Sequence, residues 1–479
     1  MKSVTKNSVF NIIYTTANLA FPLITTMYVS RVLLPAGVGA VSYAQNLVNY
    51  FVTAAGGGLA IYGVREIAKQ RDNLKEKNVV YSSLFTINFI LTSLALLTYL
   101  ILFVFGNGLI LDKKLSAIFV LSIVFNFINI DWFYQGEEDY VYIAIRSIII
   151  KFISTVAVIL FVRTKQDCGI YALIIALAQG SNYIFNIFHA RKFVKFRIKD
   201  IFIKKHLTPL FYISASAFLW SIYSHIDITM LGKMVNKTVA GYYSNAFRIV
   251  EISINVCLAA ITVLLPRLSI YYNTDRNKFV ELVNKALDAT IFISVPIFAG
   301  VIILSPELLS FLFGNAFLPG TPAMRVLSAM ILIKTVANLL CYQLMICTGN
   351  EKKRLPAYII ACVLNIAMNW LLIPILGAVG AAIASVASEF FVDAYQYVYI
   401  KRRIPFSATK KGLLQAFLGT LIMALAVLLL KNYCKVGSLF TIILCTTLGG
   451  IIYFVFNLVT GNRILSAILS KLLKPLRRR

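Results

Sequence analysis

The chain has 479 residues, of which 59% are hydrophobic and only 14% are charged. A soluble globular domain usually carries roughly 25% charged residues, so this composition excludes an ordinary soluble fold and indicates a polytopic membrane protein. The net charge of +27 would suit a nucleic-acid-binding protein, but the distribution of the basic residues, given below, argues against that function.

Apolar segments long enough to cross a hydrocarbon core of about 30 Å recur along the whole chain. The segments at 38–62 and 377–400 are rich in Gly, Ala, Ser and Tyr, which is typical of helices that line a polar interior. We predict an all-α fold with fourteen transmembrane helices, at 8–30, 38–62, 79–105, 115–136, 141–162, 169–190, 207–231, 240–266, 285–304, 323–348, 355–374, 377–400, 411–430 and 437–460.

The basic residues alternate between the loops that join these segments. One set of loops holds 32 of the 46 Lys and Arg residues, and the alternate set holds 9. This asymmetry follows the positive-inside rule for a chain with both termini in the cytoplasm and an even number of spans. The positive charge therefore reports topology and attraction to anionic lipid headgroups, and we expect no nucleic-acid partner.

The long basic segment at 191–207 is amphipathic and separates two groups of six spans. We predict an N-terminal lobe at 1–206, a C-terminal lobe at 207–409, and two further helices with a basic tail at 410–479. Residues 39–48 and 239–248 also align at an offset of two hundred residues, which suggests related lobes. The seven cysteines are scattered and form no CxxC motif, which argues against a disulfide framework or a metal site.

Charged side chains at membrane depth usually face a bundle interior or a water-filled cavity. Arg248, Lys334 and Lys151 lie deep in predicted spans, and Arg31 lies nearer a span end, where snorkelling to the interface also accounts for it. Such a cationic cavity favours an anionic substrate. The acids that could oppose these cations in coupling or gating are Glu251, Glu389 and Asp227.

Amide side chains form polar stripes on several predicted spans. They either line the cavity and contact substrate or tie helices together by hydrogen bonds. The candidates are Asn11, Asn18, Gln45, Asn46, Asn49, Asn245, Asn255 and Asn338.

The stretch DWFYQGEEDY at 131–140 is acidic, although the chain as a whole is strongly basic. Asp131 lies seven residues before Glu138 and Arg146 eight residues after it. In a tight antiparallel hairpin both would reach about 10–12 Å from the turn, so we predict that they pair across two helices. The aromatic run at 132–134 suits the aromatic belt at a membrane interface.

Four segments carry a resemblance to a known family. YVSRVLLPAGVGAVSYAQNLVNYF at 28–51, DWFYQGEEDY at 131–140, YYSNAFRIVEISINVCLAAITVLLPRLS at 242–269 and ILGAVGAAIASVASEF at 375–390 resemble the polysaccharide flippases of the MOP exporter superfamily. That resemblance implies two pseudo-symmetric six-helix lobes in a V with two extra C-terminal helices. It also implies transport, rather than catalysis, by alternating access.

The implied substrate is an undecaprenyl-pyrophosphate-linked oligosaccharide, which is moved from the inner to the outer leaflet of the bacterial cytoplasmic membrane. We expect no cofactor, a proton or sodium gradient as driving force, membrane lipids and the polysaccharide polymerase machinery as partners, and a monomer. The chain contains no GxxxxGK[ST] nucleotide motif.

Three other functions remain open. A lipid II flippase is disfavoured because many of them carry an arginine three residues after the second Tyr of the eighth helix, where this chain has Ala246. A MATE-type drug or cation antiporter would be expected to depend on interior acids. A membrane polymerase or ligase would need a large external loop with catalytic groups, and the longest one, at 306–321, has one acid and no base.

Overall fold

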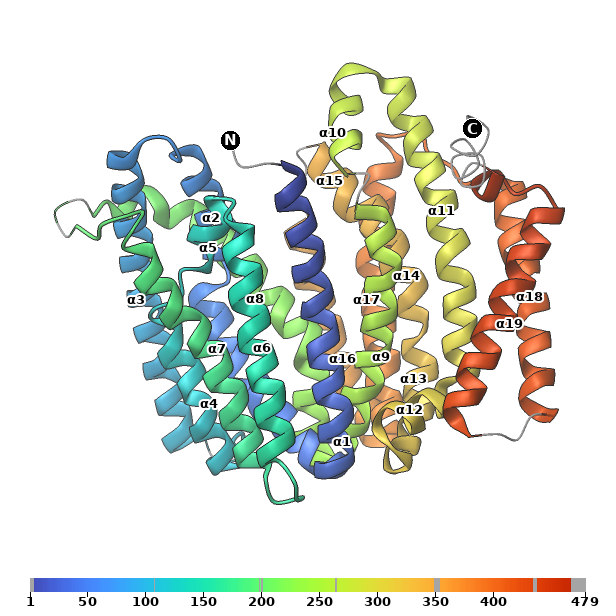
Figure 1. Cartoon of the computed structure of the whole chain (residues 1–479), viewed down its shortest axis with the longest axis horizontal. Coiled ribbons are helices and arrows are strands. Elements are labelled where there is room, and N and C mark those ends of the chain that lie inside the picture. Colours follow the sequence, from blue (N-terminus) through green and yellow to red (C-terminus); the bar gives the residue numbers. More distant parts are fainter. Residues whose placement is uncertain are drawn as a thin grey trace. The chain divides into compact units, whose positions relative to one another are not determined.

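The computed structural model describes residues 4–106, 108–197, 199, 201–262, 265–348, 354–433 and 437–466, with the side chains of 4–16, 18, 19, 260–266, 342, 346 and 354 left out. Within these ranges all regular secondary structure is helical, as predicted (Figure 1). Contacts divide the chain into two compact units, 1–241 and 242–479.

The first unit is a helical bundle in which α1 contacts α3, α4, α6, α7 and α8. The short helices α2 and α5 pack against each other at one end. The helices of this unit are α1 (Val4–Gly56), α2 (Leu59–Lys69), α3 (Leu74–Phe105), α4 (Lys113–Asn126), α5 (Asp131–Gly136), α6 (Tyr140–Phe161), α7 (Cys168–Ala190) and α8 (Ile203–Met234), followed by the first residues of α9 (Lys237–Thr262).

α1 combines the first two predicted spans, which are separated by a kink at Leu34. Leu34 has φ 59° and ψ 175°, outside helical geometry, and Pro35 follows it. Proline disfavours the α conformation in the residue before it, so the break falls there. Other helices begin at side-chain caps: Asn73 accepts a hydrogen bond from the Glu76 amide at the start of α3, and Asp112 accepts one from Leu115 at the start of α4.

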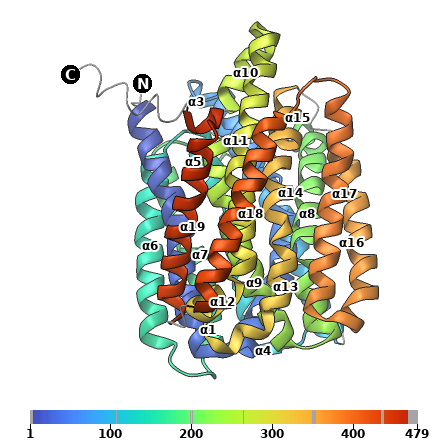
Figure 2. The same cartoon turned by 90° about the vertical axis from the view of Figure 1, so that its right-hand side faces the viewer.

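The second unit contains most of α9 and all later helices. Figure 2 shows α16 beside α17 and α18 beside α19, and α11 also packs against α18. The remaining elements are α10 (Leu265–Thr274), α11 (Arg276–Ile303), α12 (Ser305–Phe313), a 3₁₀ helix (Asn315–Gly320), α13 (Thr321–Leu327), α14 (Ala329–Ala337), a π-helical turn (Asn338–Gln343), α15 (Leu344–Cys347), α16 (Arg354–Leu376), α17 (Ala378–Lys401), α18 (Lys410–Tyr433) and α19 (Ser438–Val459).

In the part of the chain that the structure describes, nine helices are long and apolar enough to cross a membrane, or ten if the bent pair at 315–327 and 329–341 is one span. The predicted count of fourteen is therefore not confirmed. One reason is that α1 and α2 are counted together as a single run, and another is that α4 has only 14 residues. The predicted lobes at 1–206, 207–409 and 410–479 also stay predictions.

The outer helices expose large apolar side chains. On α3, Phe89, Leu94 and Leu97 are each more than half exposed, and α18 exposes Leu414 and Phe417 to a similar degree. Water disfavours such apolar faces, whereas hydrocarbon solvates them. This surface supports a multi-pass membrane protein, as the composition predicts.

Candidate functional site

The structure brings Asp131 and Arg146 together, as the hairpin argument predicts. Arg146 Nη2 lies 3.2 Å from Asp131 Oδ1. The arginine side chain is 8% exposed and the aspartate side chain 38%, so the pair lies at the edge of the buried interior of the first unit. The pair joins the start of α5 to α6.

Two asparagines of α7 also contact this pair, and neither was predicted from the sequence. Arg146 Nε donates to Asn182 Oδ1 at 3.0 Å, and its Nη1 donates to Asn186 Oδ1. Asn186 Nδ2 in turn donates to Asp131 Oδ1 at 2.6 Å. The two asparagines are four residues apart and so share one helix face, which is the only signal in the sequence that points to them.

The aromatic residues after Asp131 do not form an interfacial belt, so that expectation is wrong. Trp132, Phe133 and Tyr134 are buried in the core of the first unit. The short α5 packs against α2, where a Cβ on Gly63 would lie 2.9 Å from the indole of Trp132. Tyr134 donates a hydrogen bond from its hydroxyl to the Asn186 carbonyl.

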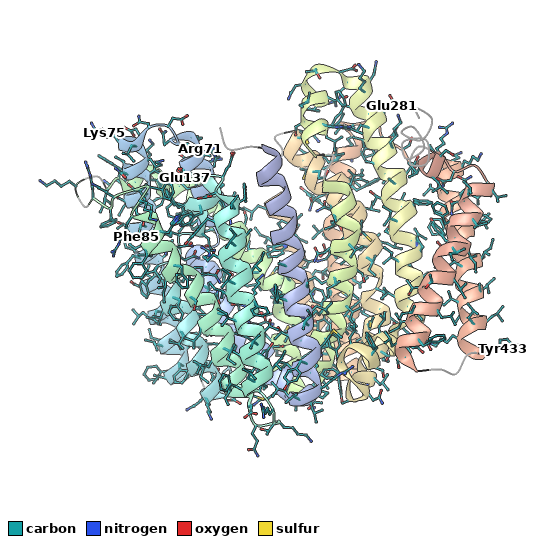
Figure 3. All side chains as sticks on the ribbon, in the orientation of Figure 1. Arg71, Lys75, Phe85, Glu137, Glu281 and Tyr433 are labelled. Carbon is teal, nitrogen blue, oxygen red and sulfur yellow. The ribbon has the colours of Figure 1, made fainter. Side chains whose placement is uncertain are left out.

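The acids of the turn after α5 pair with cations of the preceding loop. Lys77 Nζ lies 3.2 Å from Glu137 Oε1, and Arg71 Nη1 lies 3.0 Å from Glu138 Oε2. Figure 3 shows Arg71 and Glu137 at the same end of the first unit. The hydrogen bond with Glu138 raises the pKa of Arg71. The acidic stretch thus neutralises neighbouring basic residues, which accounts for the sign of its charge.

In the second unit, the structure brings Lys334 and Glu389 together. Lys334 Nζ of α14 lies 3.5 Å from Glu389 Oε2 of α17, and their side chains are 24% and 14% exposed. The π-helical turn follows α14 directly, and there Asn338 Oδ1 accepts a hydrogen bond from Gln343 Nε2 at 3.2 Å. Single π turns inside helices are frequent at functional sites.

The other predicted residues of the second unit lie on α9. Asn245 is buried, Arg248 and Asn255 are half-buried, and Glu251 is exposed.

The aligned segments at 39–48 and 239–248 share buried positions. Ala40 and Tyr43, and Ala240 and Tyr243 two hundred residues later, are all buried. Tyr43 donates to the Leu109 carbonyl at 2.6 Å, whereas the hydroxyls of Tyr243 and Ser385 lie 3.1 Å apart.

The predicted residues of the first unit lie on three helices. On α1, Arg31 is exposed, and Gln45, Asn46 and Asn49 are half-buried; Lys151 on α6 is half-buried and Asp227 on α8 is buried. The side chains of Asn11 and Asn18 lie outside those that the structure describes. A cationic cavity shared by both halves of the chain stays a prediction.

Two further polar contacts of the second unit were not predicted. On α16, Asn369 Nδ2 donates to Asn365 Oδ1 at 3.0 Å, and both side chains are buried. Lys431 Nζ lies 3.0 Å from Glu307 Oε1 and also donates to the Ile303 carbonyl. The first contact was detectable as two amides four residues apart, whereas the second joins residues far apart in the sequence.

Comparison with known proteins agrees with the family resemblance. The family described as "Polysaccharide biosynthesis protein" matches residues 4–271, more than half of the chain. A putative O-antigen transporter of Escherichia coli K12 is 24% identical over 83% of this chain and 97% of its own length. A probable low-salt glycan biosynthesis flippase, Agl15 of Haloferax volcanii, is 23% identical over half of each chain.

Solved structures share the fold. The lipid II flippase MurJ, in an inward closed conformation, superposes with a TM-score of 0.76 at 18% identity, over 94% of this chain and 98% of that one. A multidrug resistance MATE family transporter of the MOP superfamily, facing inward, gives 0.61 at 16% identity, over 82% and 98%. The family match over more than half of its length shows that the chain belongs to the polysaccharide biosynthesis protein family.

Proposed function

We propose that this protein moves an undecaprenyl-pyrophosphate-linked oligosaccharide repeat unit from the inner to the outer leaflet of a bacterial cytoplasmic membrane. The relatives support a flippase for lipid-linked glycans in general. The observation that carries the choice of an anionic substrate is the Lys334 ammonium, which is three-quarters buried in the second unit. A cation in such a low-dielectric setting strongly favours a phosphate partner.

In this mechanism, Lys334 and Arg248 of the second unit bind the pyrophosphate. Lys151 is a further candidate ligand, and Arg31 is assigned to the outer mouth. Glu389 competes with the phosphate for Lys334, since its carboxylate lies 3.5 Å from the ammonium. Glu389 is therefore a candidate for coupling or gating. Glu251 and Asp227 are further candidates for coupling to a proton or sodium gradient, and the amide and tyrosine side chains contact sugars.

We further propose that the protein has both termini in the cytoplasm and works as a monomer without a cofactor. The translocated oligosaccharide is then used by the polymerase machinery. Deletion of the gene should cause one intact undecaprenyl-pyrophosphate-linked oligosaccharide to accumulate inside the cell, as measured by mass spectrometry of lipid-linked glycans. Accumulation of lipid II would contradict the substrate assignment, and no accumulation would favour a drug or cation antiporter.

Complementation of the deletion strain tests the site. Lys334→Ala combined with Arg248→Ala should leave the precursor accumulated, because both cations assigned to the pyrophosphate are removed. Lys285→Ala, which removes an exposed lysine paired with Glu281 on α11, should restore transport fully. Glu389→Gln should still bind substrate, because it removes the carboxylate that competes for Lys334. Full transport by the double variant would refute this site.

A further inference from the structure

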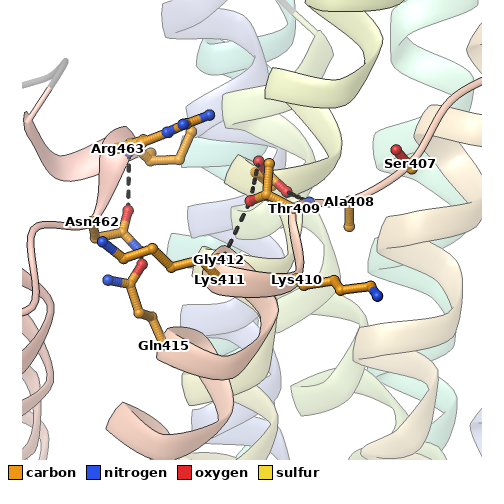
Figure 4. Close-up of a pocket in the computed structure, with 11 residues that line it drawn as sticks. Ser407, Ala408, Thr409, Lys410, Lys411, Gly412, Gln415, Asn462 and Arg463 are labelled. Carbon is orange, nitrogen blue, oxygen red and sulfur yellow. Dashed lines mark hydrogen bonds between the residues drawn. The ribbon is translucent and has the colours of Figure 1, made fainter.

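A second cationic site lies in the second unit, at the start of α18 and away from the Lys334–Glu389 pair. An open pocket of about 420 Å³ forms between the segment that leads into α18, its first turn, and the residues that follow α19 (Figure 4). Its lining contains three cations, Lys410, Lys411 and Arg463, and one acid, Asp288 of α11. The mechanism proposed above uses none of these residues.

Buried amide side chains build the floor of this pocket. Asn462 and Gln415 are 3% and 6% exposed. Asn462 Nδ2 donates to Gln415 Oε1 at 3.2 Å and to Asn457 Oδ1 at 3.0 Å, while its Oδ1 accepts from the Ile464 amide at 3.0 Å. This network ties the backbone beside Arg463 to α18, while the Arg463 side chain itself is exposed.

The acid in the pocket is engaged in capping α18. Asp288 Oδ1 accepts from the Thr409 amide and Oδ2 from the Thr409 hydroxyl, both at 2.9 Å. Thr409 Oγ1 in turn accepts from the Gly412 amide at 3.3 Å. In Figure 4, Lys411 extends toward Asn462 and Arg463 extends over the first turn of α18, whereas Lys410 extends to the other side. Lys411 and Arg463 thus both line the pocket, while Asp288 and Thr409 occupy the cap of α18.

We propose that this pocket binds the phosphate headgroup of an anionic membrane lipid. An ammonium and a guanidinium that line one pocket suit a phosphate, which accepts charge-assisted hydrogen bonds from both. The same helix supplies a path for the attached chain, since Leu414, Phe417 and Leu418 on the next turns are exposed. The ligand is therefore a phosphate that carries a hydrocarbon chain, rather than free phosphate.

The test uses the purified full-length protein in detergent, titrated with phosphatidylglycerol and followed by native mass spectrometry. Lys411→Gln with Arg463→Gln should weaken binding on the order of tenfold to thirtyfold, because each cation near a lipid headgroup contributes about 1 kcal/mol. Asp288→Asn keeps an acceptor oxygen for Thr409 but removes the opposing charge, so this variant should bind severalfold more tightly.

The matched control is Lys204→Gln with Lys205→Gln, which removes two exposed cations at the start of α8. This variant should retain binding within about twofold. An equal loss of lipid affinity in both double variants would show only a general attraction between basic loops and anionic lipid, and would overturn the proposal. Unchanged binding in the pocket variant would also overturn it. Inorganic pyrophosphate should compete only weakly, and competition as strong as that of the lipid would overturn the assignment to a lipid-attached phosphate.

Discussion

Arg146 is held by one carboxylate and two amides, and each partner compensates for taking the guanidinium out of water. Asp131 supplies the opposite charge, Asn182 accepts from Nε and Asn186 accepts from Nη1. Removing one partner of a buried pair leaves an uncompensated charge, which typically costs more than the pair contributes. The arrangement therefore suits a structural clasp between α5, α6 and α7.

Asp131→Ala should lower the free energy of unfolding by about 3 kcal/mol, since it leaves Arg146 buried without a counter-charge. Asp131→Asn should cost less, because an amide oxygen can still accept from Arg146 and Asn186. Denaturant titration of the purified protein in detergent measures both values.

The control for this prediction is Glu281→Ala, which breaks the pair with Lys285 on α11, where both side chains are more than 60% exposed. Exposed pairs contribute at most about 1 kcal/mol, so this variant should differ little from the native chain. A loss for Asp131→Ala no larger than for Glu281→Ala would show that the clasp is not a stabilising contact.

The predictability of this site depended on how far apart its residues lie in the sequence. The pairing of Asp131 with Arg146 was predictable because a single turn separates them and helical rise fixes their depth. The partners Asn182 and Asn186 were not, since nothing local to α7 indicates which helix it faces. For the same reason, Lys334 and Glu389 were identified separately as charges at membrane depth, but not as a contact.

At the scale of helices, the kink in α1 and the start of α9 approach each other so closely that only glycine fits. A Cβ on Gly39 would lie 1.7 Å from the Lys237 carbonyl oxygen, and one on Gly241 would lie 2.1 Å from the Pro35 oxygen. Both obstacles are backbone atoms, which cannot rotate away. Small residues permit such helix crossings inside membranes.

Gly39→Ala should therefore force the two helices apart and lower the free energy of unfolding by about 3 kcal/mol or more. Gly300→Ala on α11 is the matched control, because a Cβ there meets nothing within 4 Å. This control should be neutral or up to about 1 kcal/mol more stable, as alanine favours helix over glycine. Equal thermal unfolding midpoints for the two variants would contradict the close crossing.

The elements themselves were predicted unevenly. Long apolar runs such as those of α3, α6, α18 and α19 were recognised because twenty apolar residues have few other stable arrangements. The short α5 was missed: its aromatic residues were assigned to the interface by composition. All three are buried in the core of the first unit, Trp132 against Gly63. The π-helical turn after α14 has no signal in hydropathy, since it changes only the hydrogen-bond register.

At the scale of the whole molecule, the alternation of basic loops predicts that both units have one cytoplasmic end. Lys75 and Arg71 lie at one end of the first unit (Figure 3). Arg71 contacts the turn before α6, and the loop at 163–167 follows α6. In the second unit, Glu281 and Tyr433 lie at opposite ends (Figure 3). Each unit thus offers one residue on each predicted side of the membrane for labelling.

Single cysteines test this orientation in a chain whose native cysteines are replaced by serine. Lys165→Cys and Tyr433→Cys should react with a membrane-impermeant maleimide in intact cells, because both follow an odd number of predicted spans. Lys75→Cys and Glu281→Cys should react only after the membrane is permeabilised. The reverse pattern would place the termini outside. Any pattern in which Lys75 and Glu281 differ would contradict the six predicted spans between them and require a different span count.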